Sequence, residues 1–136
     1  MLRVLPKYIF FGIYNKSGAT LDGNADLDFK IVPWKYDSNG AVVYGTEVTF
    51  TVDQNISNGL FSILTGADED IDNTTDKNLG LFIFVNAKPG TSSGTVEVWV
   101  HGSNDASIYA SNEQGWHIGT VVITTDKGDN KGYFAI

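Results

Sequence analysis

The densest group of candidate ligands in this chain of 136 residues is the acidic run DEDID from Asp68 to Asp72. Carboxylates at alternate positions are typical of calcium loops, because Ca²⁺ takes about six to eight oxygen ligands from a flexible segment. The EF-hand frame does not fit: counted from Asp68, the sixth position is Asn73 instead of glycine and the twelfth is Leu79 instead of glutamate. We therefore expect a solvated acidic loop over residues 65–78 and no metal site.

The histidines and two glutamates are the next candidates for chemistry. His101 and His117 lie on two expected strands that could be neighbours, but two imidazoles are too few for a zinc site, and surface positions are the simpler interpretation. A glycoside hydrolase needs two carboxylates across a cleft, and Glu97 and Glu113 are conceivable members whose spacing does not support the pairing. We expect no catalytic residue, no cofactor and no enzymatic activity.

Aromatic residues, which make up 12% of the chain, offer a binding site instead of a catalytic one. Sugar-binding modules stack aromatic rings on the apolar face of a pyranose, and core packing or a protein interface is the competing interpretation of such rings. Trp99 separates these interpretations best, because its neighbours Val98 and Val100 are expected to point the other way. The residues that could form a sugar platform are Trp34, Tyr36, Trp99, Tyr109 and Trp116.

Composition and charge exclude several classes of protein. The net charge of −7 opposes binding to nucleic acid, because phosphate neutralisation needs clustered Lys and Arg. Cysteine is absent, so neither disulfides nor thiolate metal sites contribute. The longest apolar run near the N-terminus, Ile9 to Ile13, is too short for a signal peptide or a membrane span, so we expect no membrane partner and no secretory export.

The elements that must position these residues are strands. Apolar residues alternate at period two along most of the chain, and no sustained helical repeat occurs. This pattern, at a length that supports one core, predicts a single antiparallel β-sandwich or jelly-roll-like domain over residues 1–136, with about eight strands. The expected strands are Lys7 to Tyr14, Leu27 to Ile31, Ala41 to Val52, Leu60 to Leu64, Leu79 to Ala87, Val96 to Val100, Gly115 to Thr125 and Tyr133 to Ile136.

Details of these strands make further predictions. Pro33 is expected to end the second strand, the Asp37 to Gly40 cluster to form a hairpin turn, and Gly45 to mark a bulge. Val96, Val98 and Val100 should face inward. Leu79 to Ala87 is almost continuously apolar, so we expect a central strand covered on both faces, by other elements or by a neighbouring subunit.

Apolar residues also lie close to both ends of the chain, where most domains fray. They are Ile9, Phe10 and Phe11 near the start and Phe134 and Ile136 at the end. Either these segments are ordinary strands of the same sandwich, or they pair with adjacent subunits.

The region from Val96 to Ile123, with a shorter segment from Ser17 to Leu21, resembles small jelly-roll-like structural proteins of tailed bacteriophages. Those proteins show a VEVYL-type strand, a G/S-x-D-G/A-x-x-Y loop and a glycine-led strand. The corresponding segments here are Val96 to Val100, Gly102 to Tyr109 and Gly115 to Ile123.

The resemblance implies a virion component on the capsid surface, made in the host cytoplasm: in the first place a capsid decoration or cement protein, with a tail or fibre component next. A sugar-binding module is the alternative from another class, and a glycosidase a further one. The implied partners are the major capsid protein and further copies of this chain, with a trimer favoured. The candidate interface residues are Ile9, Phe10, Phe11, Trp99, Tyr109, Trp116, Phe134 and Ile136.

Overall fold

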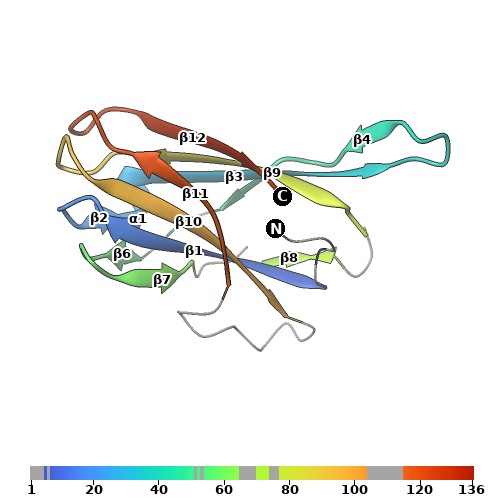
Figure 1. Cartoon of the computed structure of the whole chain (residues 1–136), viewed down its shortest axis with the longest axis horizontal. Helices are drawn as coiled ribbons and strands as arrows, with labels where there is room; N and C mark the ends of the chain where they lie inside the picture. The colour runs from blue at the N-terminus through green and yellow to red at the C-terminus, as the bar shows by residue number, and fades with distance from the viewer. Residues whose placement is uncertain are drawn as a thin grey trace.

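Two antiparallel sheets lie face to face and form a β-sandwich (Figure 1). The computed structural model describes residues 5, 7–50, 52, 54–64, 70–73, 77–103 and 115–136. The prediction of an all-β antiparallel sandwich is confirmed. In chain order the elements are β1 (Tyr8–Lys16), β2 (Leu21–Asp22), α1 (Gly23–Asp26), β3 (Leu27–Tyr36), β4 (Val42–Tyr44), β5 (Val48–Phe50), β6 (Asn55–Ile56), β7 (Phe61–Ile63), β8 (Asp70–Asp72), β9 (Gly80–Ala87), β10 (Thr95–Ser103), β11 (Trp116–Val122) and β12 (Asn130–Ala135).

Strands distant in sequence are neighbours in both sheets. The first sheet has the order β11-β10-β1-β7, with β8 also paired to β1. The second has the order β12-β9-β3-β4, with β5 also paired to β3, and β2 and β6 form a separate two-stranded ribbon. The first and last described strands both belong to the sandwich: β1 is an inner strand of the first sheet and β12 is the outermost strand of the second.

The core between the sheets is built from alternate side chains of each strand. Phe11 of β1 meets Phe29 of β3 and Phe50 of β5, with ring centroids 5.2 and 5.4 Å apart respectively. The side chains of Val96, Val98 and Val100 are completely buried, which confirms the predicted inward row of β10. Burial of this kind stabilises the fold by about 25 cal/mol for each Å² of apolar surface removed from water.

Pro33 does not end its strand as predicted, because β3 continues through it to Tyr36. Its missing N–H needs no partner there, since Pro33 lies between the stretches of β3 that pair with β4 and with β5. Gly45, where a bulge was expected, separates β4 from β5, and its N–H donates to the Pro33 carbonyl at 2.8 Å. A Cβ at Gly45 would lie 2.8 Å from the Pro33 ring.

The segment 65–78 is not a loop throughout. Its residues 70–72 form β8, which pairs with the start of β1, and Ile71 joins the core. Asn73 and Asn78 are buried, with the Asn73 amide donating to the Asn78 carbonyl at 3.0 Å. Residues 65–69 and 74–76, which include Asp68 and Glu69 of the acidic run, lie outside the described residues.

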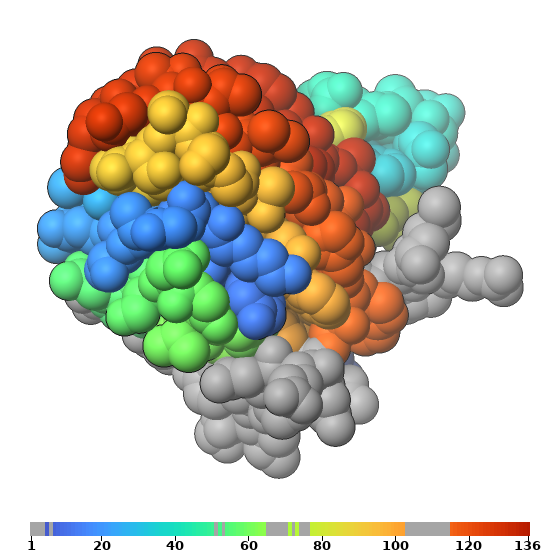
Figure 2. All heavy atoms as spheres, turned by 60° about the vertical axis from the view of Figure 1, so that its left-hand side comes forward, coloured from blue at the N-terminus to red at the C-terminus, as the bar shows by residue number. Residues whose placement is uncertain are grey.

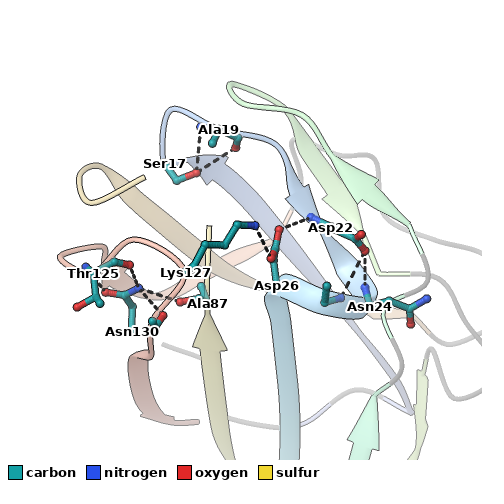
Figure 3. A network of polar contacts seen from close by, with 11 residues as sticks. Ser17, Ala19, Asp22, Asn24, Asp26, Ala87, Thr125, Lys127 and Asn130 are labelled. Carbon is teal, nitrogen blue, oxygen red and sulfur yellow. Dashed lines mark hydrogen bonds and ion pairs between the residues drawn. The ribbon is translucent and has the colours of Figure 1, made fainter. Parts of the chain in front are cut away.

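The buried side chain of Asn130 fixes the connections at one end of the sandwich. Asn130 at the start of β12 accepts from the backbone N–H of Thr124 and Thr125 and donates to the carbonyls of Ala87 and Gly128 (Figure 3). Asn130 is 4% exposed, so its hydrogen bonds are protected from water. The Asn130 side chain thus ties β12 to the end of β9 and to the turn that precedes β12.

An ion pair holds the same end of the molecule together. The buried carboxylate of Asp26 accepts from Lys127 at 3.0 Å and from the Asp22 N–H at 3.0 Å (Figure 3). Asp22 in turn caps α1 through the N–H groups of Asn24 and Ala25. The turn after β11 is thereby attached to the start of β3.

Candidate functional site

The outer face of the β12-β9-β3-β4 sheet carries exposed aromatic side chains. Alternation along the strands produces it: Leu81, Ile83 and Val85 of β9 are buried in the core, so Phe82 and Phe84 point outward. The same alternation turns side chains of β3 and β12 to this side. The residues that we call the aromatic face are Trp34, Tyr36, Val42, Tyr44, Phe82, Phe84 and Tyr133.

The rings of the aromatic face contact one another. Phe82 lies with its ring centroid 6.5 Å from Trp34 and 6.0 Å from Tyr44, and Trp34 lies 5.5 Å from Tyr36. Phe84 and Tyr133 form a second pair at 5.2 Å. Tyr133 is 73% exposed, Tyr44 63%, Tyr36 52% and Phe82 42%. Large apolar side chains gathered at such exposure mark an interaction site.

A groove of about 380 Å³ opens on this face. Its floor and walls are mostly apolar, with Phe82, Phe84 and Tyr133 among the lining residues. Lys30 and Glu47, also among them, form an ion pair with Nζ and Oε1 3.5 Å apart. Both partners are well exposed, so the pair adds little stability, and it supplies charged hydrogen-bonding groups beside the apolar surface.

Charges of both signs also lie beside the aromatic face near the start of β3 and the end of β9. Lys88 lies 3.3 Å from Asp28 and 4.0 Å from Asp129. The pKa of Asp129 is lowered, chiefly by the hydrogen bond from the Asn86 amide; desolvation opposes this shift, and the charges of Lys131 and Lys88 add to it. The carboxylate therefore stays ionised to a lower pH than an ordinary aspartate.

A two-stranded arm extends the aromatic face beyond the body of the sandwich (Figures 1 and 2). We define the arm as residues 34–44, the end of β3, the turn and β4. Residues 36–47 are all exposed. The turn predicted at Asp37 to Gly40 is confirmed: Gly40 has φ of 80°, and the Asp37 carboxylate accepts from the N–H groups of Asn39 and Ala41 at 2.8 and 2.9 Å.

Several residues predicted for an interface are instead part of the core. Ile9, Phe10 and Phe11 are completely buried within the chain, so they are removed from the candidate surface. They belong to the inner strand β1, where side chains on both faces of the strand are covered. Of the two alternatives for this segment, the structure shows the first: it is an ordinary strand of the same sandwich.

The C-terminal residues of the predicted interface are also engaged within the chain. The Phe134 ring occupies the space next to Gly119 of β11 and Gly132 of β12, where added Cβ atoms would collide with it. The N–H and carbonyl of Ile136 bond to Leu81 at 3.0 Å each, which extends the pairing of β12 with β9. Both side chains pack partly against the core.

Trp99 lies half-buried on the opposite sheet from the aromatic face. Its Nε1–H donates to the Glu97 carboxylate at 3.3 Å, and its ring contacts Phe61 at 6.2 Å and His117 at 5.1 Å. The aromatic residues considered for a sugar platform therefore do not gather on one face: Trp34 and Tyr36 lie on one sheet and Trp99 and Trp116 on the other. The fifth member, Tyr109, lies outside the described residues.

The surroundings of Trp99 affect the ionisation of Glu97. Partial burial opposes its ionisation, but hydrogen bonds from Lys16 at 2.9 Å and from Trp99, with the nearby positive charge, outweigh burial and lower the pKa of Glu97. Glu97 is thus an ion-pair partner in this structure. Glu113, the other carboxylate considered for glycoside hydrolysis, lies outside the described residues.

His101 of β10 and His117 of β11 lie on adjacent strands, which the sequence left open. The expectation that both are at the surface is wrong for His101, which is completely buried. Among the described residues, no three His, Cys, Asp or Glu side chains gather closely enough to hold a metal ion. No helix in the described part of the chain has the length and apolarity to cross a membrane.

The aromatic face includes residues that the sequence did not single out, namely Tyr44, Phe82, Phe84 and Tyr133. The signal that could have found the two phenylalanines is the run from Leu79 to Ala87, where apolar residues occupy both faces of one strand. Comparison with known proteins adds no relative: no family model, no curated protein and no solved structure matches the chain.

Proposed function

We propose that this protein is a non-catalytic structural domain that docks its aromatic face onto another protein surface, and that it serves as a capsid decoration or cement protein. The observation that carries the docking proposal is the continuous exposed surface formed by Tyr36, Tyr44, Phe82 and Tyr133. The virion setting is suggested by the resemblance of the Val96 to Ile123 region to phage structural proteins.

The composition of this face supports a protein as its partner. Tyr, Trp and Phe are enriched in the buried centres of protein interfaces, whereas charged residues are depleted there and lie at the rim. Here rings from β3, β4, β9 and β12 share one face, and the charged groups are paired with one another beside them, Lys30 with Glu47 and Lys88 with Asp129. Rings of this size are the side chains that contribute most when truncated from an interface.

A cement function requires only contact area. Copies bound to the shell would bridge capsid subunits by removing apolar surface from water, and many copies would add small contributions that stiffen the shell.

The test is binding to phage shells that lack the protein, measured by co-sedimentation and by heat resistance of the shells. We expect wild-type protein to bind and to raise the heat resistance, and Phe82→Glu to bind at least about ten-fold more weakly, because it places a charge where rings would be desolvated. Val122→Glu is the matched control, since Val122 is 63% exposed on the other sheet. Wild-type protein that neither binds nor protects the shells would refute the proposal.

A carbohydrate is the second candidate partner, favoured by the groove in which aromatic rings adjoin the Lys30 and Glu47 charges. Rings would stack on a sugar while the charged groups bond its hydroxyls. This function predicts signals on a glycan array that Tyr133→Ala abolishes with little loss of stability, because Tyr133 is so exposed. A blank array would eliminate it and leave the protein partner.

A further inference from the structure

The strand β9 presents apolar side chains on both faces, yet the outer face is covered less completely than the inner one. Leu81, Ile83 and Val85 are buried between the sheets, whereas Phe82 on the other face is 42% exposed. Strands with apolar residues on both faces are typical of sheets covered on both sides. Within the described residues, nothing packs over Phe82 to the extent that the core packs over its neighbours.

The arm needs a cover for a separate reason. The pairing of β3 with β9 ends at Trp34, so beyond this residue the described arm consists of two strands. A two-stranded hairpin is only marginally stable in water, and most need packing on one face. Trp34, Tyr36, Val42 and Tyr44 lie on one face of the arm through the pairs Trp34–Tyr44 and Tyr36–Val42, and this face is continuous with Phe82.

We propose that a second copy of this chain provides the cover, in a two-fold dimer in which the arm of each copy lies over the groove of the other. This inference rests on the docking part of the proposed function: it names a second copy as the protein that covers the aromatic face, so a shell would be contacted by the dimer through its other surfaces. The arm and the groove lie on the same side of one sheet. Placing the arm of one copy over the groove of the other therefore turns the two faces toward each other, which is the geometry of a two-fold interface and not of an open chain.

The area of the aromatic face matches what a dimer needs. With roughly 200 Å² for a whole aromatic side chain, the exposed fractions of Tyr36, Tyr44, Phe82 and Tyr133 correspond to roughly 450 Å² per copy. Two copies would bury roughly 900 Å² through these four side chains alone, close to the roughly 1,000 Å² that a biological interface should exceed. Trp34, Val42 and Phe84 supply the remainder.

The charge of this face does not oppose pairing with itself. The chain carries a net charge of −7, but the ionised groups around the aromatic face balance one another. When two copies of the face are opposed, a lysine of one copy can therefore lie against a carboxylate of the other. The excess negative charge of the chain lies elsewhere on its surface. The groups are Lys30, Lys88 and Lys131 and, with opposite sign, Asp28, Glu47 and Asp129.

Sedimentation equilibrium over a wide range of protein concentration tests the dimer. We expect wild-type protein to approach twice the monomer mass, Phe82→Glu and Tyr44→Glu each to raise the dissociation constant at least about ten-fold, and Val122→Glu to leave it unchanged. Far-UV circular dichroism and thermal melting of each variant would establish that the sandwich is folded. A monomer at every concentration, a trimer, or equal effects of Phe82→Glu and Val122→Glu would overturn the inference.

Cross-linking tests the arrangement of the arm, and the absence of cysteine from the chain makes single-cysteine variants unambiguous. A short bismaleimide should join Tyr44→Cys of one copy to Tyr133→Cys of another in mixed samples, and should not join Val122→Cys to either. Failure to link the first pair would overturn the arm-over-groove geometry. Monomeric protein that binds shells through a surface sensitive to Phe82→Glu would overturn the dimer and leave the proposed function standing.

Discussion

Replacement of Asn130 by alanine tests how the sandwich holds the strand that carries Tyr133. The Asn130 Oδ1 accepts two backbone hydrogen bonds, from Thr124 at 2.8 Å and Thr125 at 3.0 Å, and its Nδ2 donates to the carbonyls of Ala87, Thr125 and Gly128 at 2.9, 3.0 and 3.2 Å. Alanine would leave these backbone groups without their partner.

The expected loss of unfolding free energy follows from these contacts. Each lost hydrogen bond costs about 0.5–1.5 kcal/mol net, and a backbone group left buried without a partner costs about 1–3 kcal/mol. Of the acceptors, the Ala87 carbonyl is in the buried part of the network, while the turn carbonyls are partly open to water. We expect Asn130→Ala to lower the unfolding free energy by about 3–4 kcal/mol, and the Tm by about 10–15 °C for a chain of this size.

Urea denaturation followed by tryptophan fluorescence measures this loss, with Asn24→Ala as the control. Asn24 is an exposed residue of α1, so its replacement should change the free energy by less than about 0.5 kcal/mol. Hydrogen exchange should become faster at the start of β12, and dimerisation should weaken because Tyr133 is on this strand. A loss for Asn130→Ala below about 1 kcal/mol would refute the reasoning, since water would then replace the amide at little cost.

Three further changes test the pH dependence and the arm. Glu97→Gln should lower stability by less than about 1 kcal/mol at neutral pH, since Lys16 is well exposed. Because the folded pKa of Glu97 is lowered, the stability difference in urea titrations should start to shrink as pH falls below the ordinary glutamate pKa of about 4.5 and should disappear below the folded pKa. Gly80→Ala should displace the Trp34 ring and the Ile136 carbonyl, which both occupy the space of an added Cβ, and should therefore change the tryptophan fluorescence of the chain and weaken the pairing of Ile136 with Leu81. Gly40→Ala should cost about 1 kcal/mol and weaken dimerisation, since Gly40 has φ of 80°; unchanged sedimentation would contradict this.

The fold was predictable from the sequence because alternation reports directly on burial. Val96, Val98 and Val100 alternate with polar or bulky neighbours, and all three are completely buried. The failure at Pro33 has a specific cause: a proline interrupts a strand only where its N–H would be needed, and the local gap between β4 and β5 removes that need. Such a gap depends on the pairing of distant residues and leaves no local signal.

The candidate site was less predictable, because exposure of an aromatic residue depends on which strands become neighbours. Trp34 and Trp99 were grouped from their type alone, yet they lie on different sheets. Ile9 and Phe11 were treated as terminal, but β1 pairs with both β10 and β7 and becomes an inner strand. Proximity to the end of a chain does not determine position in a sheet whose neighbours come from distant parts of the sequence.

The sequence of β9 does contain the information that the structure makes specific. A strand that is buried on one face needs only one row of apolar residues, and Leu81, Ile83 and Val85 supply that row. Phe82 and Phe84 form a second row, which exposes aromatic surface at a cost in solubility unless something covers it. Because Tyr44 of the arm and Tyr133 of β12 come from different strands and extend the same row, the pattern is a property of the whole face. Because four strands contribute aromatic residues to one surface, a partner that covers this surface explains the pattern better than a separate chance exposure of an aromatic residue on each strand.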